Sequence, residues 1–213
     1  MAKLLCLARF DYTFFVIFRQ DFCYNFLDTI DYVYSLTFNI SCQGRKYMEL
    51  RKFDIGSDFE IIKNWIDDER THAMWCAKLF EYPLNRENVA QVLEDAAEKY
   101  GDVPYIAMED GREVGFFCYH TNQDTKEGML KFVIVNPECR GKGIANEMLK
   151  SVVEYAFENT GAELVKLNVF PENIRAKKCY EKAGFVERNL TENAFTFKDE
   201  SWGRCNMIIR KNF

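Results

Sequence analysis

The segment from Val135 to Ala145 constrains the fold of this 213-residue chain more than any other part of the sequence. An apolar run, Met129 to Val135, ends at the breaker pair Asn136-Pro137, and Gly141 and Gly143 follow before apolar residues resume at helical spacing. This pattern predicts a strand, a glycine loop and a helix start. Backbone N–H groups without intrahelical acceptors then face one small volume, where the helix dipole favours negative charge. The segment therefore predicts a site for a phosphorylated cofactor.

Two nucleotide-binding fingerprints fit this segment poorly. The string G-x-x-x-x-G-K-[ST] does not occur in the chain. In the dinucleotide fingerprint G-x-G-x-x-G, the third glycine position is occupied here by Asn146. That fingerprint also requires an acidic residue at the end of the next strand to hold a ribose, but the predicted strand 164–169 is followed by Phe170-Pro171. Judged by the loop alone, a plain strand-to-helix turn without a ligand stays open as an alternative.

A second motif, N-I-R-A-K-K-C-Y-E-K-A-G-F, runs from Asn173 to Phe185. Together with Arg140-x-x-Gly143-x-Ala145, it resembles the GNAT superfamily of acetyl-CoA-dependent N-acetyltransferases. In that family the R/Q-x-x-G-x-G/A loop binds the pyrophosphate, and the Y-x-x-x-G-F ending belongs to a companion strand and helix. The resemblance extends from about Met48 to Lys211. It implies an α/β fold with a mixed α+β sheet, whose central parallel strands splay apart to admit the cofactor.

The resemblance also implies which residues form the site. It places at Tyr180 the donor that protonates the leaving thiolate, whereas spacing alone favours a tyrosine packed against the sheet. Asn173 is expected both to cap a helix and to hydrogen-bond the pantetheine arm, two roles that compete for one amide. The other expected cofactor-binding residues lie on a strand and on the loop after it. The strand residues pair their backbone with the pantetheine arm: Val133, Ile134 and Val135. The loop residues hold the phosphates: Arg140, Gly141, Lys142, Gly143, Ile144 and Ala145.

Neither a general base nor the acceptor is defined by the sequence. The predicted strand 129–135 has no carboxylate, and Glu127, Glu138 and His120 lie nearby without an assignable role. The acceptor is expected to bear an amine, and protein N-termini, lysines, aminoglycosides, polyamines and small metabolites stay open. Aromatic residues are candidates for its pocket, although most of them are expected in the core: Trp65, Trp75, Phe80, Tyr82, Phe116 and Tyr119.

Three classes of function compete at this point. The resemblance predicts an acyltransferase that moves an acetyl group from acetyl-CoA to a primary amine by direct attack. A non-catalytic acyl-CoA-binding sensor or interaction module is the alternative. A dinucleotide-dependent oxidoreductase is disfavoured by Asn146 and by the missing ribose acid.

Composition narrows the partners and the compartment. A net charge of −5 argues against a nucleic acid bound through its phosphates. Eight cysteines without a C-x-x-C pair, and only His72 and His120, predict reduced thiols in a cytoplasmic protein without a metal site. The apolar stretch from Tyr12 to Phe18 is too short to span a bilayer, so no membrane partner is expected. The sequence leaves open whether the chain forms a homodimer.

Residues 1–47 differ in kind from residues 48–213, which we expect to form the acetyltransferase domain. Twelve aromatic residues crowd into the first 47 positions without a clear period. One interpretation is a helical arm. Our hypothesis is that residues 1–47 are a start-site extension and that Met48, which opens the first predicted strand, is the natural start. Gly44-Arg45-Lys46 before it can be encoded by a purine-rich stretch that resembles a bacterial ribosome-binding site. Loss of activity and of thermal stability on deleting residues 1–47 would contradict this hypothesis.

Periodicity and turn residues divide residues 48–213 into elements without a repeat or linker. A capping box at 57–60 predicts a helix through 66, and a second helix is expected from Asn85 to Gly101. Asp110-Gly111 predicts a hairpin between strands 103–109 and 112–119. The remaining predicted elements are strands 129–135, 164–169, 185–190 and 205–210 and helices 140–159 and 173–183.

Overall fold

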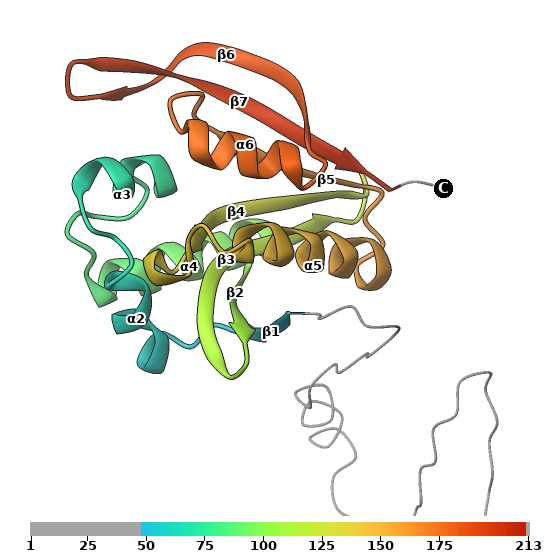
Figure 1. The fold of residues 1–213 in the computed structure, drawn as a ribbon, viewed down its shortest axis with the longest axis horizontal. Coiled ribbons are helices and arrows are strands. Elements are labelled where there is room, and N and C mark those ends of the chain that lie inside the picture. The colour runs from blue at the N-terminus through green and yellow to red at the C-terminus, as the bar shows by residue number, and fades with distance from the viewer. Residues whose placement is uncertain (1–47, 212–213) are drawn as a thin grey trace, which may run out of the picture. The chain divides into compact units, whose positions relative to one another are not determined.

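The computed structural model describes residues 48–211, and both interpretations of residues 1–47 concern positions outside this range. The described residues form a seven-stranded mixed sheet in the order β1-β2-β3-β4-β5-β7-β6 (Figure 1). In chain order the elements are β1 (Glu49–Lys52), α2 (Ile55–Lys63), α3 (Glu69–Cys76), α4 (Arg86–Tyr100), β2 (Val103–Glu109), β3 (Arg112–Asn122), β4 (Glu127–Val135), η1 (Pro137–Cys139), α5 (Ile144–Asn159), β5 (Leu164–Val169), α6 (Ile174–Lys182), β6 (Val186–Phe197) and β7 (Glu200–Arg210). The mixed α/β fold is confirmed.

The parallel pair β4–β5 divides the sheet. The two strands pair only over Glu127–Leu130 and Leu164–Leu167, and they separate beyond these residues. In β4 the register to β3 shifts at a β-bulge, where Phe132 takes a left-handed backbone with a φ of 51°. The Trp75 indole N–H on α3 donates to the Phe132 carbonyl at 2.7 Å and holds the bulge. The bulge and the short pairing open the sheet at its centre, as the resemblance implies.

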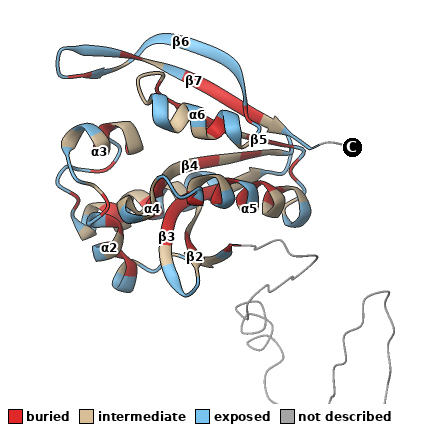
Figure 2. Ribbon diagram, in the orientation of Figure 1, coloured by how far each residue is buried: buried red, intermediate tan, exposed pale blue. Residues whose placement is uncertain are grey.

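Two hydrophobic clusters lie on the two faces of the sheet. One contains the inner face of α5 with β5 and β7, and the other contains α2 and α4 with β3. Burial follows the 3.6-residue period along α5, so that its inner face is buried while its outer face is exposed (Figure 2). Within residues 48–211, no helix has the length and the apolar character needed to cross a membrane.

The helix boundaries test the capping predictions. Asn85 caps α4 by accepting from the Asn88 N–H at 2.7 Å, and the helix ends at Gly101, both as predicted. The capping box at 57–60 is wrong, because α2 begins earlier: the Asp54 carboxylate accepts from the Ser57 N–H at 2.8 Å. An aspartate with extended backbone supplies the same acceptor one turn before the predicted box. The helix also ends at Lys63 and not at 66.

Other elements also differ from the prediction, among them β3, which extends to Asn122, and β4, which begins at Glu127. The eight-residue helix α3, capped by Asp68, was not predicted because it is too short to show a helical period. The helix expected over 140–159 begins at Ile144, since the loop keeps its own turn conformation. The last two strands are longer than predicted, because the exposed β6 gives no alternation of apolar residues along most of its length.

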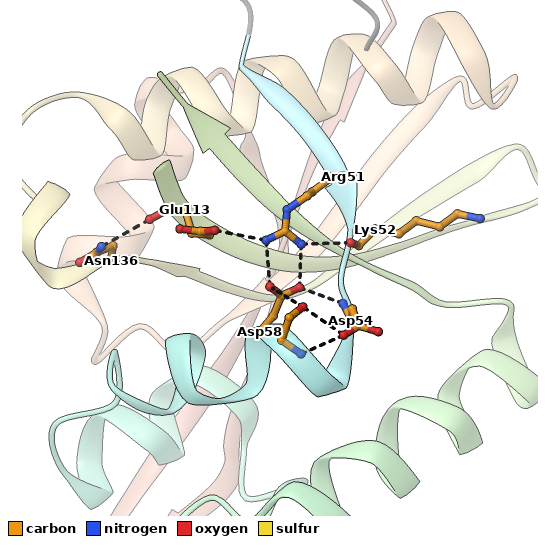
Figure 3. A network of polar contacts seen from close by, with 7 residues as sticks. Arg51, Lys52, Asp54, Asp58, Glu113 and Asn136 are labelled. Atoms are coloured by element: carbon orange, nitrogen blue, oxygen red, sulfur yellow. Dashed lines mark hydrogen bonds and ion pairs between the residues drawn. The ribbon is translucent and has the colours of Figure 1, made fainter. Parts of the chain in front are cut away.

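A polar network fixes α2 to the first strand (Figure 3). The Arg51 guanidinium on β1 donates to both carboxylate oxygens of Asp58 at 2.7 and 2.8 Å, and Glu113 on β3 accepts from the same guanidinium at 3.4 Å. The Asp54 backbone N–H also donates to Asp58 at 2.8 Å. Burial alone would raise the pKa of Asp58, but the hydrogen bonds from Arg51 and Asp54 outweigh it and hold this pKa below its usual range.

Candidate active site

A cavity of about 620 Å³ opens where β4 and β5 separate. Its walls come from β4, the glycine loop, the start of α5, the end of β5, and α6, with part of α3 at one side. The cavity brings together every site residue that the sequence predicted except Lys142, which is exposed and outside the cavity wall. The volume is in the range of small-molecule and cofactor sites.

The glycine loop forms one end of this cavity. Gly143 is the N-cap of α5 with a φ of 88°, and no side chain caps the helix. The N–H groups of Asn146 and Glu147 both return to the Gly143 carbonyl, at 2.9 and 3.2 Å. The N–H groups of Ile144 and Ala145 therefore precede the first helical hydrogen bonds and have no intrahelical acceptor. A Cβ built on Gly143 would meet nothing within 4 Å, so the space beside the Gly143 Cα is open.

An orphaned acceptor lies beside this loop. Asn146 is part of the cavity wall. Its side-chain oxygen is buried and has no hydrogen-bond partner among the described residues. Such an oxygen is costly to bury unless a ligand N–H reaches it. Free backbone donors for an anion and a free acceptor for an amide N–H fit coenzyme A, which carries a pyrophosphate and a pantetheine arm with two amides.

The charged residues of the cavity wall are all basic. Arg140 donates from Nε to the Val135 carbonyl at 3.2 Å, and burial and then the charge of Arg175 lower its pKa. An anion between these two guanidinium groups would relieve their repulsion. Sequence reasoning missed Arg175, Lys178 and Lys182, which line the cavity from α6. Their spacing of three and four residues, which places them on one helix face, was the available signal.

Tyr180 faces the same cavity from the last turn of α6. Its side chain is 8% exposed and packs edge-on against Phe185 at 6.1 Å between ring centroids, so the ring is part of the core. Its hydroxyl makes no hydrogen bond to any described residue, although Tyr180 lines the cavity. Burial, with a smaller effect of the Cys179 thiol, raises the pKa of Tyr180 above its ordinary value. The hydroxyl is therefore protonated and unpaired at neutral pH.

Asn173 caps α6 with only the oxygen of its side-chain amide. The side-chain oxygen accepts from the Ala176 N–H at 3.1 Å and caps α6. The amide NH₂ makes no hydrogen bond to a described residue, and Asn173 lines the cavity. The two roles predicted for this residue therefore do not compete, because one uses the oxygen and the other would use the nitrogen.

The aromatic candidates fall into three groups. Trp75 lines the cavity, whereas Tyr82 is 46% exposed. The others lie in the hydrophobic core, as expected for most of them: Trp65, Phe80, Phe116 and Tyr119.

The three candidate bases all lie outside the cavity wall. Glu127 forms ion pairs with Lys166 and Arg188, and these cations lower its pKa, the Lys166 hydrogen bond most strongly. Glu138 is exposed, and His120 binds the buried carboxylate of Asp102 through Nδ1. The geometry therefore assigns the general base to none of them.

A parallel strand pair that splays beside an uncapped helix start suits an acyltransferase whose donor is a coenzyme A thioester. Comparison with known proteins places the chain among the acyltransferases. The model of the acetyltransferase (GNAT) family matches residues 60–185, and the chain belongs to this family. It is an acyltransferase, and its relatives support N-acetyltransferase activity.

Several characterised relatives are similar to this chain. The aminoglycoside N(6')-acetyltransferase type 1 of Klebsiella pneumoniae is 25% identical over 140 residues, which cover 60% of this chain and 69% of that protein. The spermine/spermidine N(1)-acetyltransferase of Bacillus subtilis is 30% identical over 105 residues, covering 46% of this chain and 69% of that protein. The relatives thus include enzymes named for quite different amines.

Solved structures confirm the fold. The spermidine N-acetyltransferase of Vibrio cholerae, in complex with CoA and spermine, aligns with a TM-score of 0.65 and 21% identity. The alignment covers 78% of this chain and 96% of that one. At this identity the likeness establishes the GNAT fold and leaves the substrate to be argued from the residues of this chain.

Proposed function

We propose that this protein transfers the acetyl group of acetyl-CoA to a primary amine by direct attack, and that Tyr180 protonates the leaving thiolate. One observation carries the proposal: a single cavity connects the free N–H groups at the start of α5 with the unpaired hydroxyl of Tyr180. Relatives named for spermine and for aminoglycosides support an amine as acceptor.

The donor would be held along the cavity by groups that lack protein partners. The N–H groups of Ile144 and Ala145, with the Arg140 guanidinium, would hold the phosphates. Asn146 and the Asn173 NH₂ offer an acceptor and a donor for the pantetheine amides. The backbone of Val133 to Val135, which has no β5 partner, would pair with the same arm as an added strand. Exposed Lys142 would contribute only a more distant charge to the phosphates.

In the transfer step the amine nitrogen forms a bond to the thioester carbonyl carbon, and the carbon–sulfur bond breaks. The electron pair of that bond goes to sulfur, which takes the proton of Tyr180. The amine releases a proton to water, and water returns one proton to the Tyr180 phenolate. Burial raises the pKa of the Tyr180 phenol, so the phenol keeps its proton until negative charge develops on the sulfur as the carbon–sulfur bond breaks. Holding both reactants in place can supply roughly 7–11 kcal/mol of the barrier reduction.

A Tyr180→Phe variant tests the proton donor, because it keeps the ring that packs on Phe185 and removes only the hydroxyl. We expect kcat, followed by thiol release with an amine panel, to fall roughly 10²- to 10⁴-fold. The thermal stabilisation by acetyl-CoA should be unchanged, since a ligand that binds the native state raises its stability regardless of turnover.

Tyr155→Phe is the matched control, since the Tyr155 hydroxyl contacts Tyr105 at 3.2 Å and lies outside the cavity wall. Full turnover by Tyr180→Phe would remove Tyr180 from the mechanism. Binding of acetyl-CoA without turnover of any amine by the parent protein would instead favour a sensor.

A further inference from the structure

Asn168 on β5 is a polar residue at the point where the sheet opens. It is exposed between the buried Leu167 and Val169, and it lines the cavity. Leu167 is the last β5 residue paired with β4, so Asn168 is the first residue beyond the pairing. Because side chains alternate along a strand, Asn168 lies on the sheet face opposite the cluster that holds Leu167, Val169 and the inner face of α5. Its amide thus reaches the cavity from the face away from α5.

The orientation of this amide is fixed by Asn206, its cross-strand partner on β7. The Asn206 NH₂ donates at 3.0 Å to the Leu167 carbonyl, which can only accept, and this sets the orientation of Asn206. The same NH₂ donates at 3.0 Å to the Asn168 side-chain oxygen. The Asn168 NH₂ therefore points away from Asn206 and has no hydrogen-bond partner among the described residues. Asn168 presents a free donor to the cavity.

The cavity wall offers no carboxylate to a polycationic acceptor among the described residues. It contains Lys131, Arg140, Arg175, Lys178 and Lys182 and, within residues 48–211, no aspartate or glutamate. Lys131 occupies on β4 the position that Asn168 occupies on β5, the first residue beyond the last pair. The Lys131 ammonium donates to the buried Asp102 carboxylate at 2.5 Å, and His120 binds the same carboxylate, so Asn168 is the residue that offers a free donor at this point. A polyamine would find no free carboxylate there to balance its charges.

We infer that the acceptor amine carries an oxygen atom close to its nitrogen, and that Asn168 is the specificity-determining residue that donates a hydrogen bond to this oxygen. Amino-acid amides, peptide N-termini and amino sugars have such an oxygen, whereas linear polyamines do not. Trp75, Met74 and Phe132 form an apolar part of the cavity wall, so an apolar group on the acceptor also fits. The inference rests on the proposed function and narrows its acceptor.

The test compares phenylalaninamide, phenethylamine and spermidine as acceptors, with thiol release from acetyl-CoA as the readout. The first two amines share the aromatic group and differ in the carboxamide. In Asn168→Asp the oxygen bonded to Asn206 is kept while the NH₂ donor becomes an acceptor, so the fold is retained. We expect the ratio of kcat/KM for phenylalaninamide over phenethylamine to fall about 3- to 10-fold in the variant, the range of one neutral hydrogen bond. Comparing ratios cancels the intrinsic reactivities of the amines.

Asn64→Asp is the matched control, because Asn64 is exposed at the end of α2, is not part of the cavity wall, and gives the same change in net charge. Its ratio should equal that of the parent. An unchanged ratio in Asn168→Asp, or a parent enzyme that prefers spermidine to phenylalaninamide, would overturn the inference while leaving the acetyltransferase reaction intact. Failure of the parent to acetylate any amine would instead overturn the proposed function.

Discussion

Replacing Asp58 with asparagine tests whether the buried ion pair between β1 and α2 stabilises the domain. The Asp58 side chain is 1% exposed and accepts from two guanidinium nitrogens of Arg51 and from the Asp54 N–H. Asparagine keeps the shape but has one oxygen, so at least one donor loses its acceptor and faces an NH₂ group.

The magnitude follows from the burial of both partners. Removing one member of a buried pair costs about 3–5 kcal/mol. Arg51 is 32% exposed, and water can solvate part of the remaining cation, so we expect the lower end, about 3 kcal/mol. For a domain of this size that loss corresponds to a fall in Tm of roughly 6–12 °C.

Urea unfolding at neutral pH measures this loss as a lower midpoint at an unchanged slope m. Glu113→Gln is the control, because Glu113 is 33% exposed and contacts the same guanidinium at 3.4 Å, a pair that should contribute less than about 1 kcal/mol. A loss in Asp58→Asn no larger than that in Glu113→Gln would refute the reasoning. A changed m would show that the variant alters the compactness of the unfolded or native state, or the two-state transition, and not the ion pair alone.

Two further predictions follow from the structure. Since the folded-state pKa of Asp58 is lowered, its stabilisation is present above the unfolded pKa of about 3.9 and is lost as the pH falls through the folded pKa. The stability difference between the parent and Asp58→Asn should therefore narrow in urea titrations below about pH 4, and a difference independent of pH would contradict this assignment. Gly143→Ala and Gly101→Ala both place a Cβ at positive φ, 88° and 74°, and should each cost roughly 1 kcal/mol. Only Gly143→Ala should also abolish the thermal stabilisation by acetyl-CoA; loss of that stabilisation in both variants would point to global damage.

The glycine loop is a part of the structure that the sequence predicts by itself. Gly141, Gly143 and the breaker pair before them define a strand, loop and helix start by local backbone preferences, and these preferences need no distant contact. The hairpin at Asp110-Gly111 and the cap at Asn85 were predictable for the same reason. The family followed from two such local motifs in the right order.

Other features depend on contacts between distant segments. Phe132 takes its left-handed backbone because the register with β3 shifts and Trp75, 57 residues away in sequence, holds its carbonyl. The identities of Phe132 and Trp75 do not predict this bulge, since an aromatic strand residue ordinarily avoids positive φ. The splay that opens the cavity is therefore a tertiary property.

The sequence by itself determined the motifs that form the proposed donor site, while only the tertiary structure decided which side chains form the proposed acceptor site. The proposed phosphate recognition relies on backbone N–H groups, and the glycines that expose them can be read directly from the chain. The proposed acceptor recognition relies on side chains brought together by the sheet: Asn168 is oriented by Asn206, which lies 38 residues away in sequence on the paired strand. Such an orientation depends on register and burial, and neither is defined until the strands pair.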